Sequence, residues 1–410
     1  MSTHWHSTSK QKYGWVIVGV SAIMLSASVL STSAISVFIK ALSAEFGWHR
    51  GPVSFIFFAS MMGLAMGGIF MGRLADRSST RLVTGFGAVV IGVCLILLAQ
   101  AQFLWQFYLL FFLAAFFGTS TMFAPLIANV GNWFDKNVGL ALGLATSGQA
   151  LGQGAVLYGT AILVSEHGWR DALTTMGIIA FAVLVPLSIL IRDPSSEPKT
   201  VARNSSATDM DAPVPLSPNI VIAWLSFAVV FCCICMSVPL AHVIPMAQDQ
   251  GIPLDDASGI MFILLLAAVL GRIAFGKLAD LVGPLRSYWI AACWQTVLVF
   301  FFVRIDSVQA LNMYAFIWGF GYAGVMTGIV ICVRVMIPLA RRATALGIVT
   351  FFGWFGHGVG GYQGGLLFDL TDDYTLSFTI AALAGVINLI VVAALYFTLN
   401  RHHEDLVTAQ

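Results

Sequence analysis

The chain has 410 residues, of which 59% are hydrophobic and only 10% are charged, and its formal net charge is +1 at pH 7. Soluble domains average about 25% charged residues. A water-soluble surface cannot be built from so few charges, so the composition excludes a soluble globular protein and predicts that lipid surrounds most of the chain. The net charge by itself identifies no partner, and we expect no nucleic acid.

Taken in chain order, twelve apolar runs are long enough to cross a bilayer, which takes about 20 residues per helix. They lie at 14–37, 52–74, 82–101, 104–130, 139–165, 171–192, 219–246, 257–280, 286–305, 309–333, 345–367 and 376–400. The first run is too long for a signal peptide and lacks a small-residue cleavage site. The sequence therefore predicts an all-α membrane protein with twelve transmembrane helices.

Basic residues are distributed unequally between the two sides of these helices. Of the 20 Lys and Arg residues, four lie in loops on one side, Lys40, Arg50, Arg170 and Arg304, and most of the others lie in the loops and tails on the opposite side. Cytoplasmic loops carry an excess of Lys and Arg. We therefore expect a multi-pass protein of the cell (inner) membrane with both termini in the cytoplasm.

Residues 193–218 separate the helices six and six. This segment is rich in Pro, Ser, Asp and Ala and lacks apolar periodicity, which is typical of a flexible linker. The predicted organisation is an N-terminal tail, a six-helix bundle, a cytoplasmic linker, a second six-helix bundle and a C-terminal tail, at 1–13, 14–192, 193–218, 219–400 and 401–410.

The two halves contain a repeat. "GRLAD" at 72–76 matches "GKLAD" at 276–280, and "LALGL" at 140–144 matches "TALGI" at 344–348, so that both pairs are 204 residues apart. Two pseudo-symmetric six-helix bundles are typical of a transporter whose site lies between the halves near mid-membrane.

The first repeated motif resembles a loop of the major facilitator superfamily. "GRLADRSSTR" at 72–81 is similar to the superfamily's loop between helices 2 and 3, and "GKLADLVGPLRS" at 276–287 is a degenerate copy. The resemblance implies the major facilitator fold and conformational gating by Gly72, Asp76, Arg77 and Arg81, and by Gly276, Asp280 and Arg286. Glycine permits close helix contact, and the carboxylates can pair with arginine in one conformation and lose that contact in the other. The motif says little about substrate.

Arg272 stands in an otherwise apolar run, "VLGRIAFGKLAD" at 269–280. A charge at the bilayer centre costs about 2.5–3.5 kcal/mol on insertion scales. The equivalent residue of the first half is Gly68, so the fold alone does not require the arginine. Inside the twelve runs no Asp or Glu would pair with it, because Asp171 and Asp280 stand at the ends of their runs and Asp280 belongs to the loop motif. An anionic ligand would complete the site, and a guanidinium suits a carboxylate. A purely structural arginine is the alternative.

Several segments together resemble the monocarboxylate and oxalate–formate transporter branch of the superfamily. They are "KYGWVIV" at 12–18, "VFIKALSAEFGWHR" at 37–50, "NWFDKNVGLALGLATSGQALG" at 132–152, "PLAHVIPMAQDQGI" at 239–252 and "GGLLFDLTDDYTLSF" at 364–378. The resemblance implies that Arg272 and Lys40 bind a carboxylate. Ala268 replaces the aspartate of animal carriers, which disfavours lactate-type proton symport, and His357 stands in a helix where oxalate exchangers have a lysine, which disfavours a dianion.

Other candidates are weaker. Lys40 is equally consistent with capping the outer end of helix 1. His242 and His357 are proton-coupling candidates, because histidine titrates near physiological pH, although a hydrogen-bonded structural histidine is the alternative for each. Further candidates for contacting substrate are His242, Tyr362, Asn129 and Gln149.

No nucleotide-binding loop or hydrolytic motif occurs, so we expect neither an enzyme nor a cofactor, and the six cysteines lie in apolar runs without a metal-binding pattern. The sequence predicts a secondary active transporter of small organic anions, above all monocarboxylates, that works by alternating access as a proton symporter or an anion exchanger, and as a monomer. The alternatives are a carrier for a different solute, such as drug efflux, and a non-transporting anion sensor. The chain lacks the proline in helix 5 that proton-driven drug antiporters usually have, which argues against the first alternative. It also shows no sizeable soluble output segment, which argues against the second.

Overall fold

The structure is a computed structural model that describes residues 2–32, 34–134, 138–193, 216–338 and 341–408; for residues 2–11, 76, 138–140, 343 and 402–408 it describes the backbone only. Most of the predicted linker 193–218 lies outside these ranges. The described residues form helices and no strands. Helix α1 begins at Ser2 and helix α14 ends at Thr408, so both helices extend into the predicted tails.

The first half contains six membrane spans, two of them interrupted. Its helices are α1 (Ser2–Ser28), the short turn η1 (Val29–Ser31), α2 (Ile35–Phe46), α3 (Arg50–Arg77), α4 (Thr80–Leu98), α5 (Leu104–Leu113), the π-helical turn η2 (Ala114–Thr119), α6 (Ser120–Trp133), α7 (Val138–His167) and α8 (Trp169–Leu190). The two interruptions meet, because the hydroxyl oxygens of Ser31 and Thr119 lie 2.5 Å apart. The hydroxyl of Thr119 also donates to the carbonyl oxygen of Ser28 at 3.0 Å, so a side chain satisfies a backbone group next to the break inside the bundle.

The second half contains the other six spans. They are α9 (Pro218–Asp249), α10 (Leu254–Val282), α11 (Pro284–Val299) with the turn η3 (Phe300–Arg304), α12 (Val308–Met336), α13 (Arg342–Thr371) and α14 (Thr375–Thr408). Across the described residues of both halves, ten helical segments are long and apolar enough to cross a membrane. The remaining two spans, α7 and α13, are rich in glycine.

The packing of the helices repeats with the same offset as the sequence. A methyl group added at Gly67 would lie 2.4 Å from the carbonyl oxygen of Phe116, and one added at Gly271 would lie 2.0 Å from that of Phe320. Both partners of the second contact stand 204 residues after those of the first. Such close helix approach requires a residue without a side chain. The two halves are therefore built on one plan.

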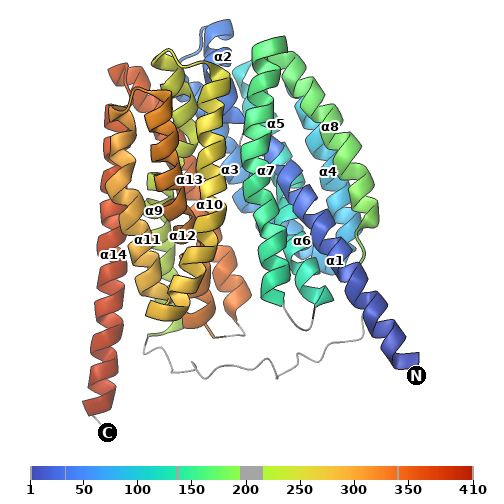
Figure 1. Ribbon diagram of the computed structural model, residues 1–410, viewed down its shortest axis with the longest axis vertical. Coiled ribbons are helices and arrows are strands. Elements are labelled where there is room, and N and C mark those ends of the chain that lie inside the picture. The colour runs from blue at the N-terminus through green and yellow to red at the C-terminus, as the bar shows by residue number, and fades with distance from the viewer. Residues whose placement is uncertain (1, 33, 135–137, 194–215, 339–340, 409–410) are drawn as a thin grey trace.

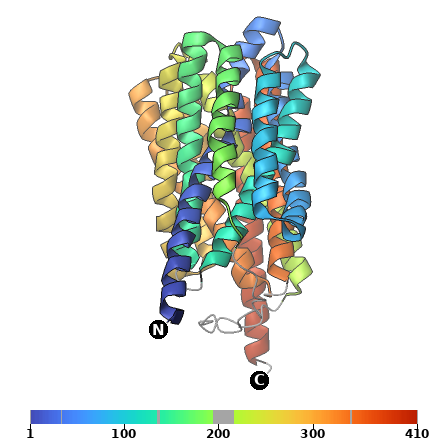
Figure 2. The same ribbon diagram turned by 90° about the vertical axis from the view of Figure 1, so that its right-hand side faces the viewer.

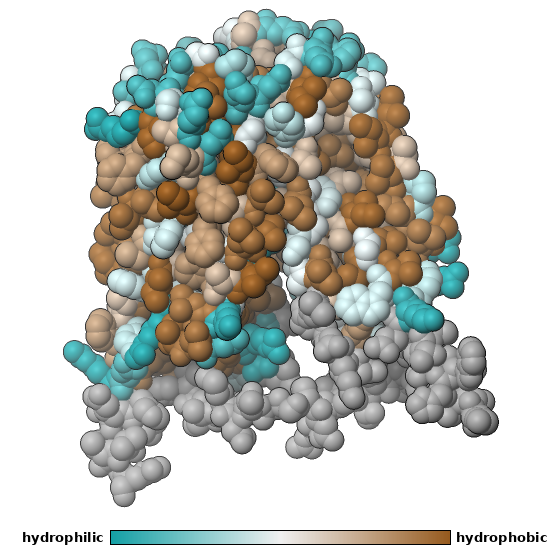
Figure 3. All heavy atoms as spheres, in the orientation of Figure 1, coloured by the Kyte–Doolittle hydropathy of each residue, from teal (hydrophilic) through white to brown (hydrophobic). Residues whose placement is uncertain are grey.

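The molecule carries an apolar belt between two polar rims (Figure 3). Large exposed hydrophobic side chains, such as Phe86, Leu97, Ile273 and Phe397, project from the belt. Both termini lie on one side of it (Figures 1 and 2). We call this the termini side and the other the closed side. A belt of this kind fits a multi-pass membrane protein.

The two halves meet on the closed side and part toward the termini side. Helix α3 packs along α13, α7 along α10, and α2 against α9. Toward the termini the bundles diverge (Figure 1), and the space-filling view shows a hollow between them (Figure 3). In this conformation the described residues of the two bundles part toward the termini side and touch on the closed side.

Candidate functional site

Arg272 lies on α10 and points toward the other half of the molecule. It is half-buried, and its Nη1 donates a long hydrogen bond of 3.4 Å to the carbonyl oxygen of Thr146 on α7. The phenol of Tyr322 on α12 lies close enough to the guanidinium of Arg272 for the two groups to interact electrostatically. None of the four ion pairs found among the described residues includes Arg272. A half-buried guanidinium between the bundles therefore has no carboxylate partner in the described part of the chain.

Helix packing directs this arginine. The preceding residue, Gly271, presses against the backbone of α12 at Phe320, so Arg272, one residue further around the helix, turns toward α7. Gln149 lies about one turn beyond Thr146 on α7, on the same face of that helix. Its half-buried amide adds both donors and acceptors to this region.

Lys40 bridges the two halves on the closed side. Its Nζ lies 3.1 Å from Asp249 Oδ1 and donates a hydrogen bond of 3.0 Å to the carbonyl oxygen of Gln248. Both partners stand at the end of α9, so Lys40 binds the end of a helix in the other half rather than the end of its own. The structure does not bring Lys40 into contact with Arg272.

Arg50, at the start of α3, contacts several residues of the other half. Its Nη1 and Nη2 lie 2.5 and 2.8 Å from the two oxygens of Asp249, and Nη1 lies 2.8 Å from the hydroxyl of Tyr374. The backbone N–H groups of Arg50 and Gly51 donate to Asp369, at 2.8 and 2.6 Å. A carboxylate at a helix N-terminus is stabilised by the helix dipole.

We call Lys40, Arg50, Asp249, Asp369 and Tyr374 the closed-side network. Its two cations and two carboxylates balance in charge, and every one of its contacts described above joins the two halves. Sequence patterns did not identify Arg50, Asp249, Asp369 or Tyr374 as functional residues. All four stand outside the predicted apolar runs, although α9 and α13 continue through both carboxylates. Their one signal in the sequence is that they lie in segments that resemble the monocarboxylate branch.

His242 is fully buried on α9 beneath this network. Its Nε2 lies 2.6 Å from the carbonyl oxygen of Gly361 on α13, and a carbonyl only accepts, so Nε2 carries the proton. Its Nδ1 has no hydrogen-bond partner among the described residues. The imidazole lies 5.3 Å from the ring of Tyr374, and a methyl added at Gly364 would collide with it. His242 therefore connects α9, α13 and the network.

His357 and Tyr362 lie where α13 packs against α3. The buried His357 ring lies 5.7 Å from that of Phe57 and 5.9 Å from that of Trp354. The ring of Tyr362 stands edge-on to Phe55 at 5.3 Å. The structure thus places both residues in the contact between the halves, without bringing either to Arg272.

Asn129 lies at the termini-side end of the first half. Its Nδ2 donates to Asp193 Oδ1 at 2.7 Å and to the carbonyl oxygen of Arg192 at 3.2 Å. Asp193 also accepts from the backbone N–H of Thr80 at 3.1 Å. The amide therefore ties α6 to the ends of α4 and α8, and the structure does not bring it to Arg272.

The predicted gating residues stand on the termini side, where the halves have parted. The side chain of Asp76 lies outside the described part of the structure. Arg77, Arg81 and Asp280 are exposed and take part in none of the ion pairs found among the described residues. Arg286 bonds instead to the hydroxyl of Tyr396, with Nε at 3.0 Å.

Neither gating glycine, Gly72 or Gly276, packs closely against another helix. A methyl group at Gly72 would meet nothing within 4 Å, and one at Gly276 would meet only the Thr327 methyl group at 4.0 Å. The close helix contact predicted for these glycines is absent from this conformation, as are the ion pairs among the described gating side chains.

The family model described as Major Facilitator Superfamily matches residues 21–293 and 223–410. The chain belongs to the major facilitator superfamily. Family and fold are consistent with a non-enzymatic transporter, and the predicted resemblance to the superfamily and its monocarboxylate branch is confirmed.

Relatives of this superfamily chain include monocarboxylate transporters. YcxA of Bacillus subtilis, named as an uncharacterized MFS-type transporter, is 26% identical over 342 residues, covering 78% of this chain and 81% of its own. Monocarboxylate transporter 12 of Xenopus laevis is 22% identical over 400 residues, 91% of this chain and 86% of its own. Monocarboxylate transporter 13 of Rattus norvegicus is 26% identical over 377 residues, 90% and 86%.

Two solved structures share the superfamily fold over nearly the whole chain. A bacterial homologue of the human lysosomal transporter Spinster, in an inward-facing and unoccupied conformation, superposes with a TM-score of 0.70 at 15% identity, covering 95% of this chain and 97% of its own. A variant of the nucleoside transporter NupG gives a TM-score of 0.75 at 14% identity, covering 94% and 99%. At these identities the likeness shows the fold alone.

Proposed function

We propose that this chain is a secondary active transporter of small monocarboxylates that binds the substrate carboxylate at Arg272. The observation that carries the proposal is the half-buried guanidinium between the bundles with no acidic partner among the described residues. Charged residues inside membranes face the bundle interior and pair, or they mark a substrate pathway. A carboxylate completes Arg272 through a charge-assisted, bidentate contact.

Two further observations support this substrate class. Gln149 and Tyr322 supply neutral polar groups close to the arginine, which suits a small polar molecule with one negative charge. The monocarboxylate transporters cited above align with nine-tenths of the chain. The same features do not favour a drug carrier, because such a substrate is usually large and apolar, while this region offers polar and charged groups.

Alternating access would reverse the ends at which the halves touch. In the proposed cycle, substrate enters from the closed side after the closed-side network separates, and leaves through the hollow seen here. Pairing of the gating residues around Asp76 and Asp280 then closes the termini side. We place the termini side in the cytoplasm, so this conformation faces inward.

Coupling in this proposal is either proton symport or anion exchange. For symport we favour His242 over His357, because its unpartnered Nδ1 can accept a proton next to the closed-side network. The ring of His357 lies among aromatic side chains, with no hydrogen bond among the described residues. Lys40 is a second cation on the substrate's route, and release of Asp249 would free it to attract an anion.

The test is uptake of labelled formate, lactate, pyruvate and longer acids into proteoliposomes, comparing the wild type with Arg272→Gln and Arg272→Lys. An inward proton gradient and preloading with unlabelled acid are applied separately. Losing a hydrogen bond to a charged group costs about 1.5–3 kcal/mol, so we expect Arg272→Gln to lower kcat/KM roughly tenfold to a hundredfold. We expect Arg272→Lys to recover part of the loss.

Arg334→Gln is the matched control, because Arg334 is an exposed cation near the end of α12 and should transport like the wild type. Thermal unfolding of all variants checks that they fold. Full transport by a folded Arg272→Gln variant, or no uptake of any acid by the wild type, would overturn the proposal. Acceleration by the gradient would identify symport, and acceleration only by preloading would identify exchange.

A further inference from the structure

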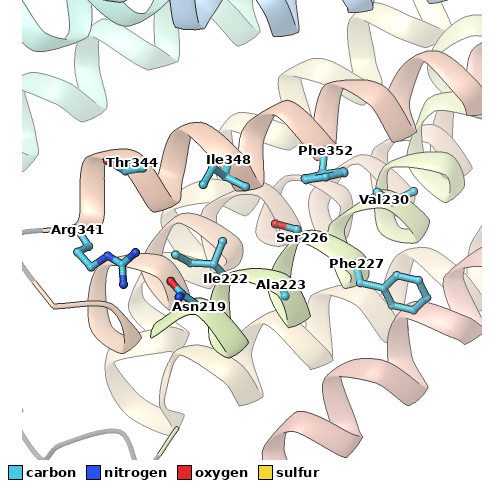
Figure 4. A pocket seen from close by; sticks show the side chains of 10 residues that line it. All are labelled: Asn219, Ile222, Ala223, Ser226, Phe227, Val230, Arg341, Thr344, Ile348 and Phe352. Carbon is cyan, nitrogen blue, oxygen red and sulfur yellow. The ribbon is translucent and has the colours of Figure 1, made fainter. Parts of the chain in front are cut away.

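A cavity of about 440 Å³ lies between α9 and α13, away from Arg272 (Figure 4). It begins at the termini-side ends of both helices, at Asn219 and Arg341, and extends to Val230 and Phe352. At 1.5 Å per helical residue it reaches roughly 16 Å along the helices. A volume of this size is in the range of ligand-binding pockets.

The internal repeat explains why α9 and α13 stand apart at the cavity. In the first half, the equivalent helices α1 and α7 touch, because Gly148 packs against the backbone of Ala22. The residues 204 positions later are Phe352 and Ser226, and both line the cavity. The phenylalanine keeps α13 away from α9 at this level. Closer to the closed side the helices meet again, where Gly356 packs against Val230.

The cavity opens to the surroundings of the protein rather than to the space between the bundles. All its lining residues come from α9, from α13 and from Arg341 directly before it. Phe227, Ile348 and Phe352 are 54%, 39% and 39% exposed and belong to the apolar belt. The opposite face of α9, with Cys232 and Leu225, is fully buried in the core of the half. The cavity is thus a groove on the lipid face.

Two polar features show what kind of molecule fits the groove. Arg341 is an exposed cation at its mouth (Figure 4), at the rim where the helices end. Ser226 is only 5% exposed and lines the groove further in, and its Oγ has no hydrogen-bond partner among the described residues. A buried hydroxyl without a partner costs free energy. A matching ligand has an anionic head, a hydrogen-bond acceptor next to it and an apolar tail.

We infer that the groove between α9 and α13 is a binding site for an anionic ester phospholipid from the termini-side leaflet. The phosphate binds Arg341, an ester carbonyl accepts from the hydroxyl of Ser226, and an acyl chain lies along Ile222, Phe227 and Ile348. A lipid seated here fills the space that Phe352 holds open. It therefore favours the separation of α9 and α13 on the termini side.

The experiment measures lipid binding by native mass spectrometry of the full chain after delipidation. The added probes are ester-linked phosphatidylglycerol, its ether-linked analogue, and phosphatidylcholine with the same chains. We expect the wild type to bind ester phosphatidylglycerol more tightly than either other lipid. A basic residue near a membrane surface contributes about 1 kcal/mol of attraction to anionic lipid, so Arg341→Gln should weaken the phosphatidylglycerol complex about fivefold. Ser226→Ala should remove the preference for the ester over the ether lipid.

Ala223→Phe places a large ring in the groove and should abolish the tight complex. Its matched control is Gly19→Phe at the equivalent position of the first half, where an added side chain meets nothing within 4 Å. Arg334→Gln is the control for charge. Unchanged binding in Ala223→Phe, equal losses in Gly19→Phe, or equal affinity for phosphatidylglycerol and phosphatidylcholine would overturn the inference. The binding readout does not depend on which solute the protein carries.

Discussion

At the scale of single residues, two arginines on the interface between the halves have opposite surroundings. Arg50 is matched by Asp249, by the hydroxyl of Tyr374 and by the ring of Phe368, whose centroid lies 3.8 Å from the guanidinium carbon. Arg272 has a single long hydrogen bond to a carbonyl. The first arginine is satisfied by the protein in this conformation. The second has no carboxylate partner among the described residues.

Asp249→Asn should shift the molecule away from the present conformation. The change leaves Lys40 and Arg50 without their shared carboxylate on the closed side only. Asp249 is 28% exposed, so solvent weakens its ion pairs. We therefore expect their loss to destabilise the present conformation by about 1 kcal/mol, a change of roughly fivefold in the ratio of the two conformations. Spin labels at Gln102 and Asp306, in closed-side loops of the two halves, should report a larger population of long distances.

Glu45→Gln is the matched control for this measurement. Glu45 pairs with Arg170 at 2.9 Å on the same side of the molecule, but both residues belong to the first half. Breaking that pair should leave the distance distribution unchanged. If the two variants shift it equally, the closed-side network does not hold the halves together.

At the scale of helices, glycines decide where the bundles are tight. Gly67 and Gly271 each press against a carbonyl of the neighbouring span, whereas Gly68, next in sequence to the first, faces open space. Neighbouring glycines on one helix thus have different roles. This difference depends on which face of the helix meets a partner, so one sequence without its structure cannot reveal it.

Gly271→Ala and Gly67→Ala should each destabilise the protein, because the new methyl group would lie 2.0 or 2.4 Å from a backbone carbonyl oxygen. Overpacking of this kind costs typically 1–3 kcal/mol. Gly68→Ala is the control, because it brings the same gain in helix propensity without the clash. The midpoint of thermal unfolding in detergent should fall for the first two variants only. Equal midpoints for Gly67→Ala and Gly68→Ala would show that the helices adjust freely.

Hydropathy was sufficient to locate the spans but not their ends or interruptions. Hydropathy places the ends of two runs at residues 246 and 367, before the next carboxylate, while the backbone hydrogen bonds of α9 and α13 continue to Asp249 and Thr371. The carboxylates of the closed-side network were therefore outside the predicted helices. The breaks at η1 and η2 were not predicted either, because their local sequences remain apolar or carry small hydroxyl residues.

At the scale of the whole molecule, the internal repeat is the feature that the sequence revealed most directly. It predicted two equivalent bundles, and comparison with Gly68 drew attention to Arg272. The closed-side network was not predictable in this way, because Arg50 reaches partners 199 and 319 residues away. Such pairs depend on how two bundles are placed in one conformation, and hydropathy carries no information on that placement.

The proposed alternating-access cycle requires the contact between α3 and α13 to open during transport, and a disulfide can test this. A Cβ atom added at Gly358 would lie 3.3 Å from the Cβ of Met61 in the other half, close to the 3.5–4.5 Å of disulfides. The Met61→Cys, Gly358→Cys double variant should lose carboxylate uptake on oxidation and regain it on reduction. Met61→Cys alone should be insensitive to oxidation, which controls for the six native cysteines. Undiminished uptake by the fully oxidised double variant would mean that the halves transport without parting here, and rocking of two rigid bundles would be the wrong mechanism.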